Sequence, residues 1–330
     1  MRNRSSGRMT RASAAAAFVA VALALLPATA AVGGGTPSLV PEKVIGGPSD
    51  TFAPTSNGTW IAWSQWDHAT EQTFVRRLDS TTQRRLNERG TGGSMGGFVG
   101  SSNTLIYQQF HGYRSDLYFY DVQTRDRTKL PAVINTSDWE YWPLASNAYI
   151  LFARLHRRAD HRTAWRRLFL FDRMSESLRP LTKQLRPSTT LSPDVIGETS
   201  AGWTVCAAAC NVWIWDAVTD TIEKLPNPLG MDQYGAAIDE AAGTITYSRD
   251  RSGRCGRNGT LRLMQIGSGT STTLTTIPDG LSLGIRRTMV ENPDTGNLDL
   301  YVSRYRCDAK PTPSGRSPAD ILVYRDIDLP

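Results

Sequence analysis

Residues 244–265 read TITYSRDRSGRCGRNGTLRLMQ, and this stretch decides the fold. An apolar strand pattern at 244–249 leads through a polar, glycine-rich loop into a second strand pattern at 261–265, as in two antiparallel strands. A similar stretch, NTLIYQQFHGYRSDLYFYDVQT, occupies residues 103–124. Two copies of one strand pair indicate that the chain contains an internal repeat.

The strand pair occurs six times. Its first strand is found at 59–64, 104–108, 149–154, 203–207, 244–249 and 300–304. Its second strand is found at 74–79, 117–121, 168–172, 212–216, 261–265 and 321–325. A turn precedes each pair, and in the first five units a leucine follows the pair at a nearly constant distance, at Leu86, Leu130, Leu181, Leu225 and Leu274. Each unit therefore predicts four strands, here named a to d, joined by hairpins.

Six such units, spaced by roughly 42 to 60 residues, predict an all-β fold, a six-bladed β-propeller of four-stranded antiparallel blades. The sixth unit stops at its c strand, whereas a strand-like stretch at 42–45 precedes the first unit. We predict that this N-terminal strand supplies the missing strand and closes the ring, because closure protects unpaired strand edges. A disordered N-terminal segment is the alternative.

The units resemble the TolB-type propeller repeat, a relative of the WD-type repeat. In that repeat a Trp-Ser-Pro-Asp-Gly-like turn leads into a strand, a polar loop and a second strand. The stretches 244–265 and 103–124 carry the resemblance, which covers about residues 50–330. Trp142-Pro143 matches the Trp-Ser-Pro-Asp-Gly-like turn only in part. The resemblance implies a β-propeller of the secreted bacterial type.

The first thirty residues have the features of a secretory signal peptide. Four arginines are followed by an apolar run at 14–26 and by the small-x-small cleavage pattern Ala28-Thr29-Ala30. We expect a signal peptide at 1–30, an N-terminal segment with the closing strand at 31–52, and the propeller at 53–330. The mature protein is expected to be secreted or periplasmic, on the exterior of the cell envelope, with no membrane span after signal cleavage.

Cleavage changes the charge of the chain. The signal peptide holds four arginines and no acidic residue, so the 37 basic residues become 33, against 31 acidic ones. The net charge then falls from +6 to +2. This balance gives no reason to expect a nucleic-acid partner. We expect a monomer.

The four cysteines predict two disulfides in an exported protein. Cys206 and Cys210 flank a three-residue turn in unit four. Cys255 and Cys307 lie in b-to-c loops of units five and six, which adjacent blades place side by side. We predict the pairs Cys206–Cys210 and Cys255–Cys307. No Cys-x-x-Cys pair is present, so a structural zinc site is not expected.

Residues 92–96, GGSMG, match the G-x-S-x-G pattern of an activated serine. They resemble the nucleophile segment of prolyl oligopeptidase-type enzymes, whose catalytic domain sits beside a β-propeller. A nucleophile elbow needs a strand before Ser94 and a helix directly after it. Here Ser94 follows a d strand at 83–86 and precedes an a strand at 98–100, which leaves no room for a helix. We predict that Ser94 is not catalytic, and we assign no catalytic residue.

The candidate binding residues lie in the loops from b to c and from d to a, which emerge on one face of the ring. The b-to-c loops hold all four histidines, and their candidates are Trp66, His68, Phe110, His111, His156, Arg157 and Arg158. The d-to-a loops add Trp139, Glu140, Tyr141, Asp232 and Tyr234, with Arg286 and Arg287 near the channel. Clustered histidines can bind a metal or a carboxylate, or can be repeated solvated residues. We expect no metal and no cofactor.

Two functions fit these residues. The first is an exported, non-catalytic binding module that recognises a protein or peptide at the cell envelope, with an anionic glycan as a further partner of the basic loop at 154–167. The alternative is a carbohydrate-binding or carbohydrate-cleaving propeller with its site at the central channel. Cleavage requires two converging carboxylates, so Glu140, Asp194 and Asp232 separate the two functions. The sequence leaves open whether the channel carries catalysis and does not name the ligand.

Overall fold

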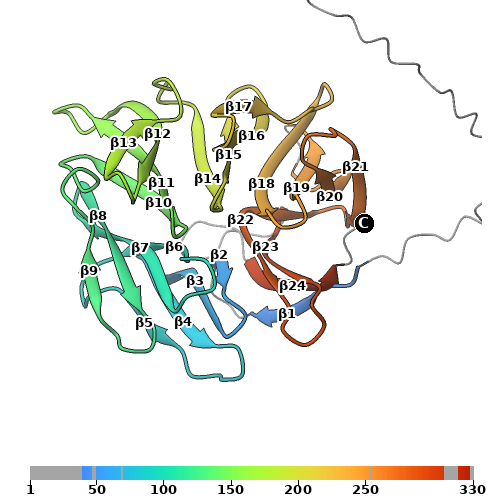
Figure 1. Ribbon diagram of the computed structural model, residues 1–330, viewed down its shortest axis with the longest axis horizontal. Helices are drawn as coiled ribbons and strands as arrows, with labels where there is room; N and C mark the ends of the chain where they lie inside the picture. The colour runs from blue at the N-terminus through green and yellow to red at the C-terminus, as the bar shows by residue number, and fades with distance from the viewer. Residues whose placement is uncertain (1–38, 47–49, 68–69, 253–254, 308–318, 328–330) are drawn as a thin grey trace, which may run out of the picture. The chain divides into compact units, whose positions relative to one another are not determined.

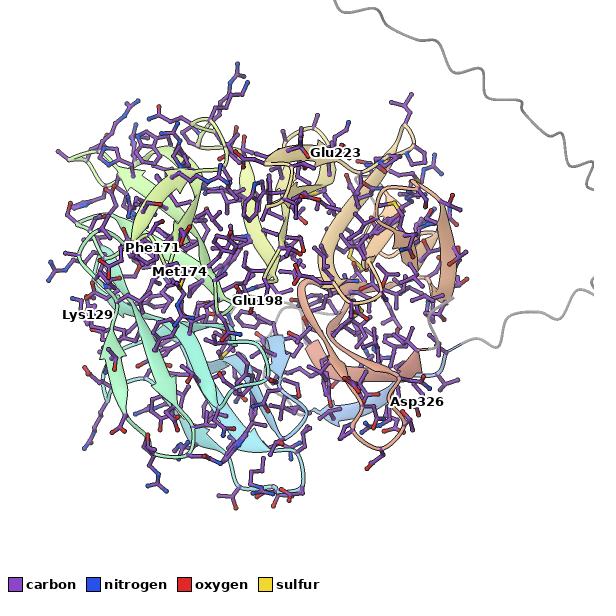
Figure 2. All side chains as sticks on the ribbon, in the orientation of Figure 1. Lys129, Phe171, Met174, Glu198, Glu223 and Asp326 are labelled. Carbon is purple, nitrogen blue, oxygen red and sulfur yellow. A yellow bond between two sulfur atoms is a disulfide. The ribbon has the colours of Figure 1, made fainter. Side chains whose placement is uncertain are left out.

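The computed structural model describes residues 39–46, 50–67, 70–252, 255–307 and 319–327. Twenty-four strands and no helix lie in this part of the chain. Within Pro37–Pro330 the sheets stand around a common centre (Figure 1). Side chains fill the spaces between neighbouring sheets (Figure 2). The fold is an all-β propeller, as the repeat predicts.

Four sheets contain four strands each. The first consists of β2 (Thr51–Ser56), β3 (Trp60–Asp67), β4 (Thr70–Arg77) and β5 (Arg84–Arg85). The second consists of β14 (Thr190–Ile196), β15 (Ser200–Cys206), β16 (Cys210–Asp216) and β17 (Thr221–Lys224). The third consists of β18 (Met231–Asp239), β19 (Thr244–Arg251), β20 (Gly259–Gln265) and β21 (Ser271–Ile277). The fourth consists of β22 (Leu281–Glu291), β23 (Leu298–Arg306), β24 (Ala319–Ile327) and β1 (Glu42–Ile45).

The remaining eight strands form one larger sheet. Its strands are β6 (Gly93–Phe98), β7 (Thr104–His111), β8 (Arg114–Asp121), β9 (Arg127–Lys129), β10 (Trp139–Ala145), β11 (Tyr149–Arg157), β12 (Thr163–Asp172) and β13 (Ser177–Pro180). Two four-stranded halves meet through one parallel residue pair, Trp139 with Ser115. The Ser115 hydroxyl also donates a hydrogen bond to the backbone carbonyl of Glu140. Six separate sheets were predicted, and this contact is the reason that two of them merge.

The N-terminal strand β1 completes the last sheet. It pairs antiparallel with β24, with Lys43 opposite Leu322. An ion pair of 2.8 Å joins the Lys43 ammonium to Asp320 on β24. Next to this sheet, Trp63 of β3 packs in one core cluster with Tyr301 of β23. The predicted strand at 42–45 is therefore confirmed, and the first and last repeats are in contact.

The leucine that follows each c strand has a fixed structural role. The backbone N–H of Leu86 donates to the carbonyl of Thr73 at 2.9 Å, and Leu130, Leu181 and Leu225 form the equivalent bond to their own c strands at 2.9 to 3.0 Å. All four leucine side chains are buried. Each of these four leucines thus fixes the outermost strand of its repeat and adds apolar area to the core between sheets, a contribution of about 2 kcal/mol per buried leucine. The fifth predicted leucine, Leu274, lies within β21 and is only half-buried.

The innermost strand of every repeat is interrupted by a β-bulge. The register shifts lie at 52–55, 95–97, 141–144, 193–195, 234–237 and 283–287. A bulge bends its strand and re-aims the side chains at that point. Because the inner strands surround the centre, the bulges decide which side chains face the channel.

Both predicted disulfides are present. Cys206–Cys210 closes the hairpin between β15 and β16, and Cys255–Cys307 joins the loops that follow β19 and β23. The predicted signal peptide lies outside the described residues. In the described residues, no helix has the length and apolar character needed to cross a membrane.

Candidate ligand-binding site

The face that carries the b-to-c and d-to-a loops holds a pocket of about 380 Å³, here called the arginine–histidine pocket. It is lined by His111, Tyr113, Arg114, Ser137, Asp138, Trp139, His156, Arg157, Arg158 and His161. These residues come from the ends of β7, β8, β10 and β11 and from the adjoining loops. Five of the predicted binding residues, from two adjacent repeats, therefore meet in one pocket.

The charges of the arginine–histidine pocket are mostly positive. Its single lining carboxylate, Asp138, contacts the Nδ1 atom of His156 at 2.8 Å. Arg114 and Arg158 are exposed. An excess of cationic side chains over one engaged carboxylate attracts an anionic ligand.

An exposed aromatic side chain lies beside these cations. Tyr113 is 63% exposed, and its ring stacks on His161 with centroids 4.1 Å apart. The Arg157 guanidinium lies 5.2 Å from the ring centre of Trp139 and 5.9 Å from that of Tyr113. Cation–π contacts of this kind orient the flat guanidinium group. Exposed tyrosine and oriented arginine are the residue types enriched where proteins bind one another.

A second pocket of about 330 Å³, here called the aromatic pocket, adjoins the first. Its lining residues are Glu71, Ser94, Gln108, Phe110, Trp139, Tyr141, Trp142, Leu155, Arg166, Thr190 and Leu191. Trp139 lines both pockets, and its ring lies 5.1 Å from that of Phe110. The predicted residues Phe110, Trp139 and Tyr141 are thus brought together as well.

Other predicted residues serve the fold. Glu140 is fully buried and binds the Nε atom of Arg154 at 2.9 Å, and burial raises the pKa of this carboxyl. Asp232 accepts hydrogen bonds from the backbone N–H of Cys210 at 2.7 Å and from the Ser252 hydroxyl at 2.9 Å. These two carboxylates line neither pocket.

Tyr234, Trp66 and His68 complete the set of predicted residues. The buried Tyr234 hydroxyl donates to Asp250 at 2.6 Å. Trp66 lies on β3 and donates its backbone N–H to the carbonyl of Asp50 at 3.1 Å. Neither residue lines the two pockets. His68 lies outside the described residues.

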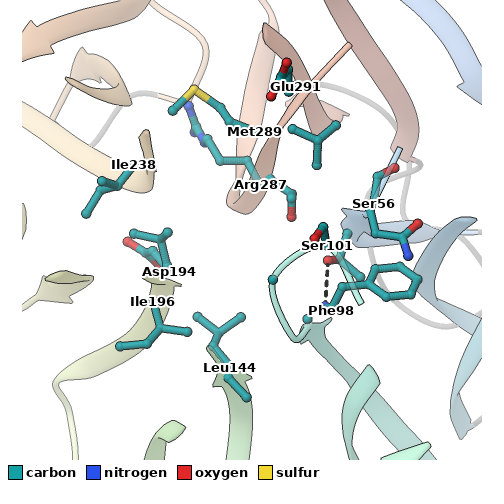
Figure 3. Close-up of a pocket in the computed structure, with 18 residues that line it drawn as sticks. Ser56, Phe98, Ser101, Leu144, Asp194, Ile196, Ile238, Arg287, Met289 and Glu291 are labelled. Carbon is teal, nitrogen blue, oxygen red and sulfur yellow. Dashed lines mark hydrogen bonds between the residues drawn. The ribbon is translucent and has the colours of Figure 1, made fainter. Parts of the chain in front are cut away.

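The centre of the ring holds three buried charges. Asp194 and Arg287 line a cavity of about 300 Å³ that is bounded by all six inner strands (Figure 3). Burial raises the pKa of Asp194 to about 7 and lowers the pKa values of Arg286 and Arg287 to about 10. The Thr204 hydroxyl and the backbone N–H of Ala236 donate to the same oxygen, Oδ2, of Asp194.

The two arginines were expected in a d-to-a loop near the channel, and the structure places both inside β22. Arg286 donates to the backbone carbonyl of Pro143 at 3.1 Å and to that of Met95, so it joins strands far apart in the sequence. Arg287 donates to the Ser248 hydroxyl at 2.8 Å. Arg286 therefore ties inner strands together, and Arg287 ties β22 to β19 of the neighbouring sheet.

Ser94 is the second residue of β6 and is buried. Its neighbours on both sides belong to the same strand, which is not the strand-to-helix geometry of a nucleophile elbow. The a strand was expected at 98–100, and it begins at Gly93 instead. Ser94 also lines the aromatic pocket.

Comparisons with family models and with curated proteins found no match. Solved structures are similar. TolB from Acinetobacter baumannii matches with a TM-score of 0.53 and 13% identity over 81% of this chain and 64% of that chain. A putative TolB from Agrobacterium tumefaciens matches with a TM-score of 0.52 and 9% identity over 84% and 91%. The fold is a TolB-like β-propeller.

An oligogalacturonate lyase in complex with manganese is also similar to this TolB-like propeller, with a TM-score of 0.50 and 11% identity over 83% of this chain and 88% of that one. At these identities the similarity establishes the fold alone, and the chain spans 64% of the length of the Acinetobacter protein. Among the described residues, no three His, Cys, Asp or Glu side chains are placed to hold a metal ion.

Proposed function

We propose that the chain is an exported, non-catalytic binding module that recognises an anionic segment of a protein at the cell envelope. The arginine–histidine pocket supports this proposal. Arg114, Arg157 and Arg158 line it, whereas its one carboxylate, Asp138, is engaged by His156. The exposed ring of Tyr113 adds an apolar contact surface beside the cations. Complementary charge of this kind speeds association and selects the partner.

The proposed architecture is a monomeric, six-bladed ring closed by β1, with a signal peptide at 1–30, an N-terminal segment at 31–52 and the propeller at 53–330. Each half of the eight-stranded sheet has the strand pattern of one repeat, which supports counting it as two blades. Two disulfides fit an oxidising compartment outside the cytoplasm. Secretion of the full-length chain, followed by N-terminal sequencing, tests this point. Cleavage after Ala30 is expected; a retained N-terminus contradicts cleavage, and a chain that stays in the cytoplasm contradicts export.

A carbohydrate ligand is the second candidate, because Trp139 and Trp142 line the aromatic pocket and aromatic faces stack on sugar rings. The positions of the carboxylates argue against cleavage, which requires two of them. Glu71 is the one carboxylate among the residues that line the aromatic pocket, while Glu140 is paired with Arg154 and Asp194 lines the separate central cavity. The binding probes therefore include an anionic sugar.

The binding test uses the mature protein with a fluorescent poly-glutamate peptide and, in parallel, an oligogalacturonide. We expect the peptide to bind, and we expect Arg157→Glu with Arg158→Glu to weaken binding at least tenfold at about 0.15 M salt. Lys183→Glu with Lys224→Glu is the matched control, since it changes the net charge equally at exposed sites outside both pockets. Equal weakening by both double variants contradicts a site in the pocket, and tighter binding of the oligogalacturonide favours the carbohydrate function.

A further inference from the structure

Trp142 has a backbone conformation that is unfavourable for its side chain. Its φ is +52°, in the left-handed region, where bulky residues are rare. It lies in the bulge of β10, between Tyr141 and Leu144. Ala53 and Gly235, in the bulges of two other repeats, also have a positive φ, so the bulge imposes this conformation, and at Trp142 it imposes it on a large aromatic side chain.

The bulge directs the Trp142 ring into the aromatic pocket. The ring is half-buried and lies 5.3 Å from that of Tyr141 in an edge-to-face arrangement. Leu155 and Leu191 add aliphatic walls. Six of the eleven lining residues are aromatic or aliphatic, and these side chains favour an apolar or aromatic group of a ligand. Glu71 and Arg166 are the two charged residues of the lining.

The chemistry next to the aromatic pocket limits what can occupy it. Trp139 separates the aromatic pocket from the arginine–histidine pocket and carries the Arg157 guanidinium over its ring at 5.2 Å. Any chain that inserts a group beside Trp142 therefore places its neighbouring groups near Arg157 and Arg158. Carboxylates complement these cations, and basic groups are repelled.

We propose that the aromatic pocket is the anchor site for one aromatic or large aliphatic side chain of a peptide segment, whose flanking acidic side chains contact the arginine–histidine pocket. This inference rests on the proposed function, since it assigns the partner's sequence chemistry at the same face. Protein surfaces commonly recognise a short segment by burying one of its side chains in a pocket that charged residues surround.

The test measures the binding of two probes, acetyl-Asp-Glu-Phe-Asp-Glu-amide and the same peptide with Ala in place of Phe, at up to about 5 mM. The Phe peptide is expected to bind about tenfold tighter, as burial of one aromatic side chain implies. Trp142→Gly should reduce this ratio to below about twofold, because it removes the ring while glycine accepts a positive φ without strain. Should Trp142→Gly fail to fold, Trp142→Asn replaces it, since asparagine also tolerates this region.

Glu176→Gly is the matched control. Glu176 has the same φ of +52° in an exposed turn between β12 and β13, so the backbone change is equivalent and the pocket is untouched. This variant should keep the full Phe-to-Ala ratio. A ratio near one in the native protein, or a ratio unchanged in Trp142→Gly, overturns the anchor site.

The two proposals fail in different ways. Arg157→Glu with Arg158→Glu should weaken both peptides while keeping the ratio between them. If this variant leaves both affinities unchanged but the ratio still depends on Trp142, the anionic-segment function is wrong and the anchor remains. An oligogalacturonide that binds through Trp142 when neither peptide binds overturns the anchor proposal in favour of a sugar.

Discussion

Asp194 makes the stability of the propeller depend on pH. Its carboxyl is fully buried at the centre of the ring, and one of its oxygens, Oδ2, accepts the hydrogen bonds from Thr204 and Ala236. Burial raises its pKa from the ordinary value of 3.8 to about 7. Between these two values the folded protein holds a proton that the unfolded chain releases. The free energy of unfolding therefore decreases as the pH rises through this window.

The size of the effect follows from the shift in pKa. Each pKa unit corresponds to about 1.4 kcal/mol, so about three units correspond to roughly 4 kcal/mol. This contribution is fully present below pH 3.8 and is lost above about pH 7. Asp194→Asn cannot ionise, and its side-chain oxygen can still accept both hydrogen bonds. The variant should equal the native protein in stability near pH 4 and exceed it by roughly 4 kcal/mol near pH 8.

Urea unfolding of the native protein and of Asp194→Asn, both with their disulfides intact, measures the difference in stability directly. Tryptophan fluorescence follows the unfolding at pH values from 4 to 8. Other titrating groups contribute equally to the two proteins and cancel in the comparison. A difference that stays constant with pH refutes the reasoning. So does an Asn variant that is less stable at pH 8, because the ionised carboxylate would then be stabilised by the nearby arginines.

Two further predictions concern the buried ion pair and the disulfides. Arg154→Ala leaves the carboxylate of Glu140 buried without its partner and should lower the free energy of unfolding by about 3 to 5 kcal/mol, whereas Lys129→Ala at a half-exposed pair should lower it by less than about 1 kcal/mol. If urea unfolding shows that Arg154→Ala and Lys129→Ala lose similar amounts of stability, the buried pair does not have the predicted larger role. Replacing Cys255 and Cys307 by alanines removes a disulfide whose cysteines are 52 residues apart in the sequence, and it should destabilise the fold by about 4 kcal/mol. Replacing Cys206 and Cys210, which are 4 residues apart, should destabilise it by about 2 kcal/mol. The reverse order in calorimetry would contradict the loop-closure argument.

The b and c strands could be predicted from the sequence because alternate residues face two neighbouring cores. TITYSR at 244–249 lies within β19, and LRLMQ at 261–265 lies within β20. The inner strands lack this signal, and β6, with the sequence GSMGGF, was expected several residues too late. Its glycines are required by close packing, since a Cβ on Gly96 would lie 2.2 Å from the carbonyl oxygen of Ile106. Because β6 consists mostly of small residues, its sequence lacks the alternation of apolar and polar residues that identifies a strand.

The candidate site could be predicted where it depends on the repeat. His111 and His156 were predicted as binding residues because they occupy equivalent b-to-c loops of adjacent repeats, and both line the arginine–histidine pocket. The ion pair of Glu140 with Arg154 could not be predicted. Arg154 lies opposite Glu140 on β11, and the bulge between Tyr141 and Leu144 shifts the pairing of the two strands in a way that the sequence does not reveal. Tyr113 was missed, although an aromatic residue beside Gly112 in a tight turn was a usable signal.

Hydrogen–deuterium exchange of the mature protein, with and without the Phe-containing acidic peptide, tests the central claim that ligands bind at the face of the b-to-c and d-to-a loops. Exchange is expected to be slower at 110–114, 139–142 and 155–161 when the peptide is bound. The turn at 146–148, at the opposite end of β10 and β11, and the turn at 57–59, between β2 and β3, should be unchanged. Protection confined to those turns, or no protection under saturating peptide, would contradict binding at this face.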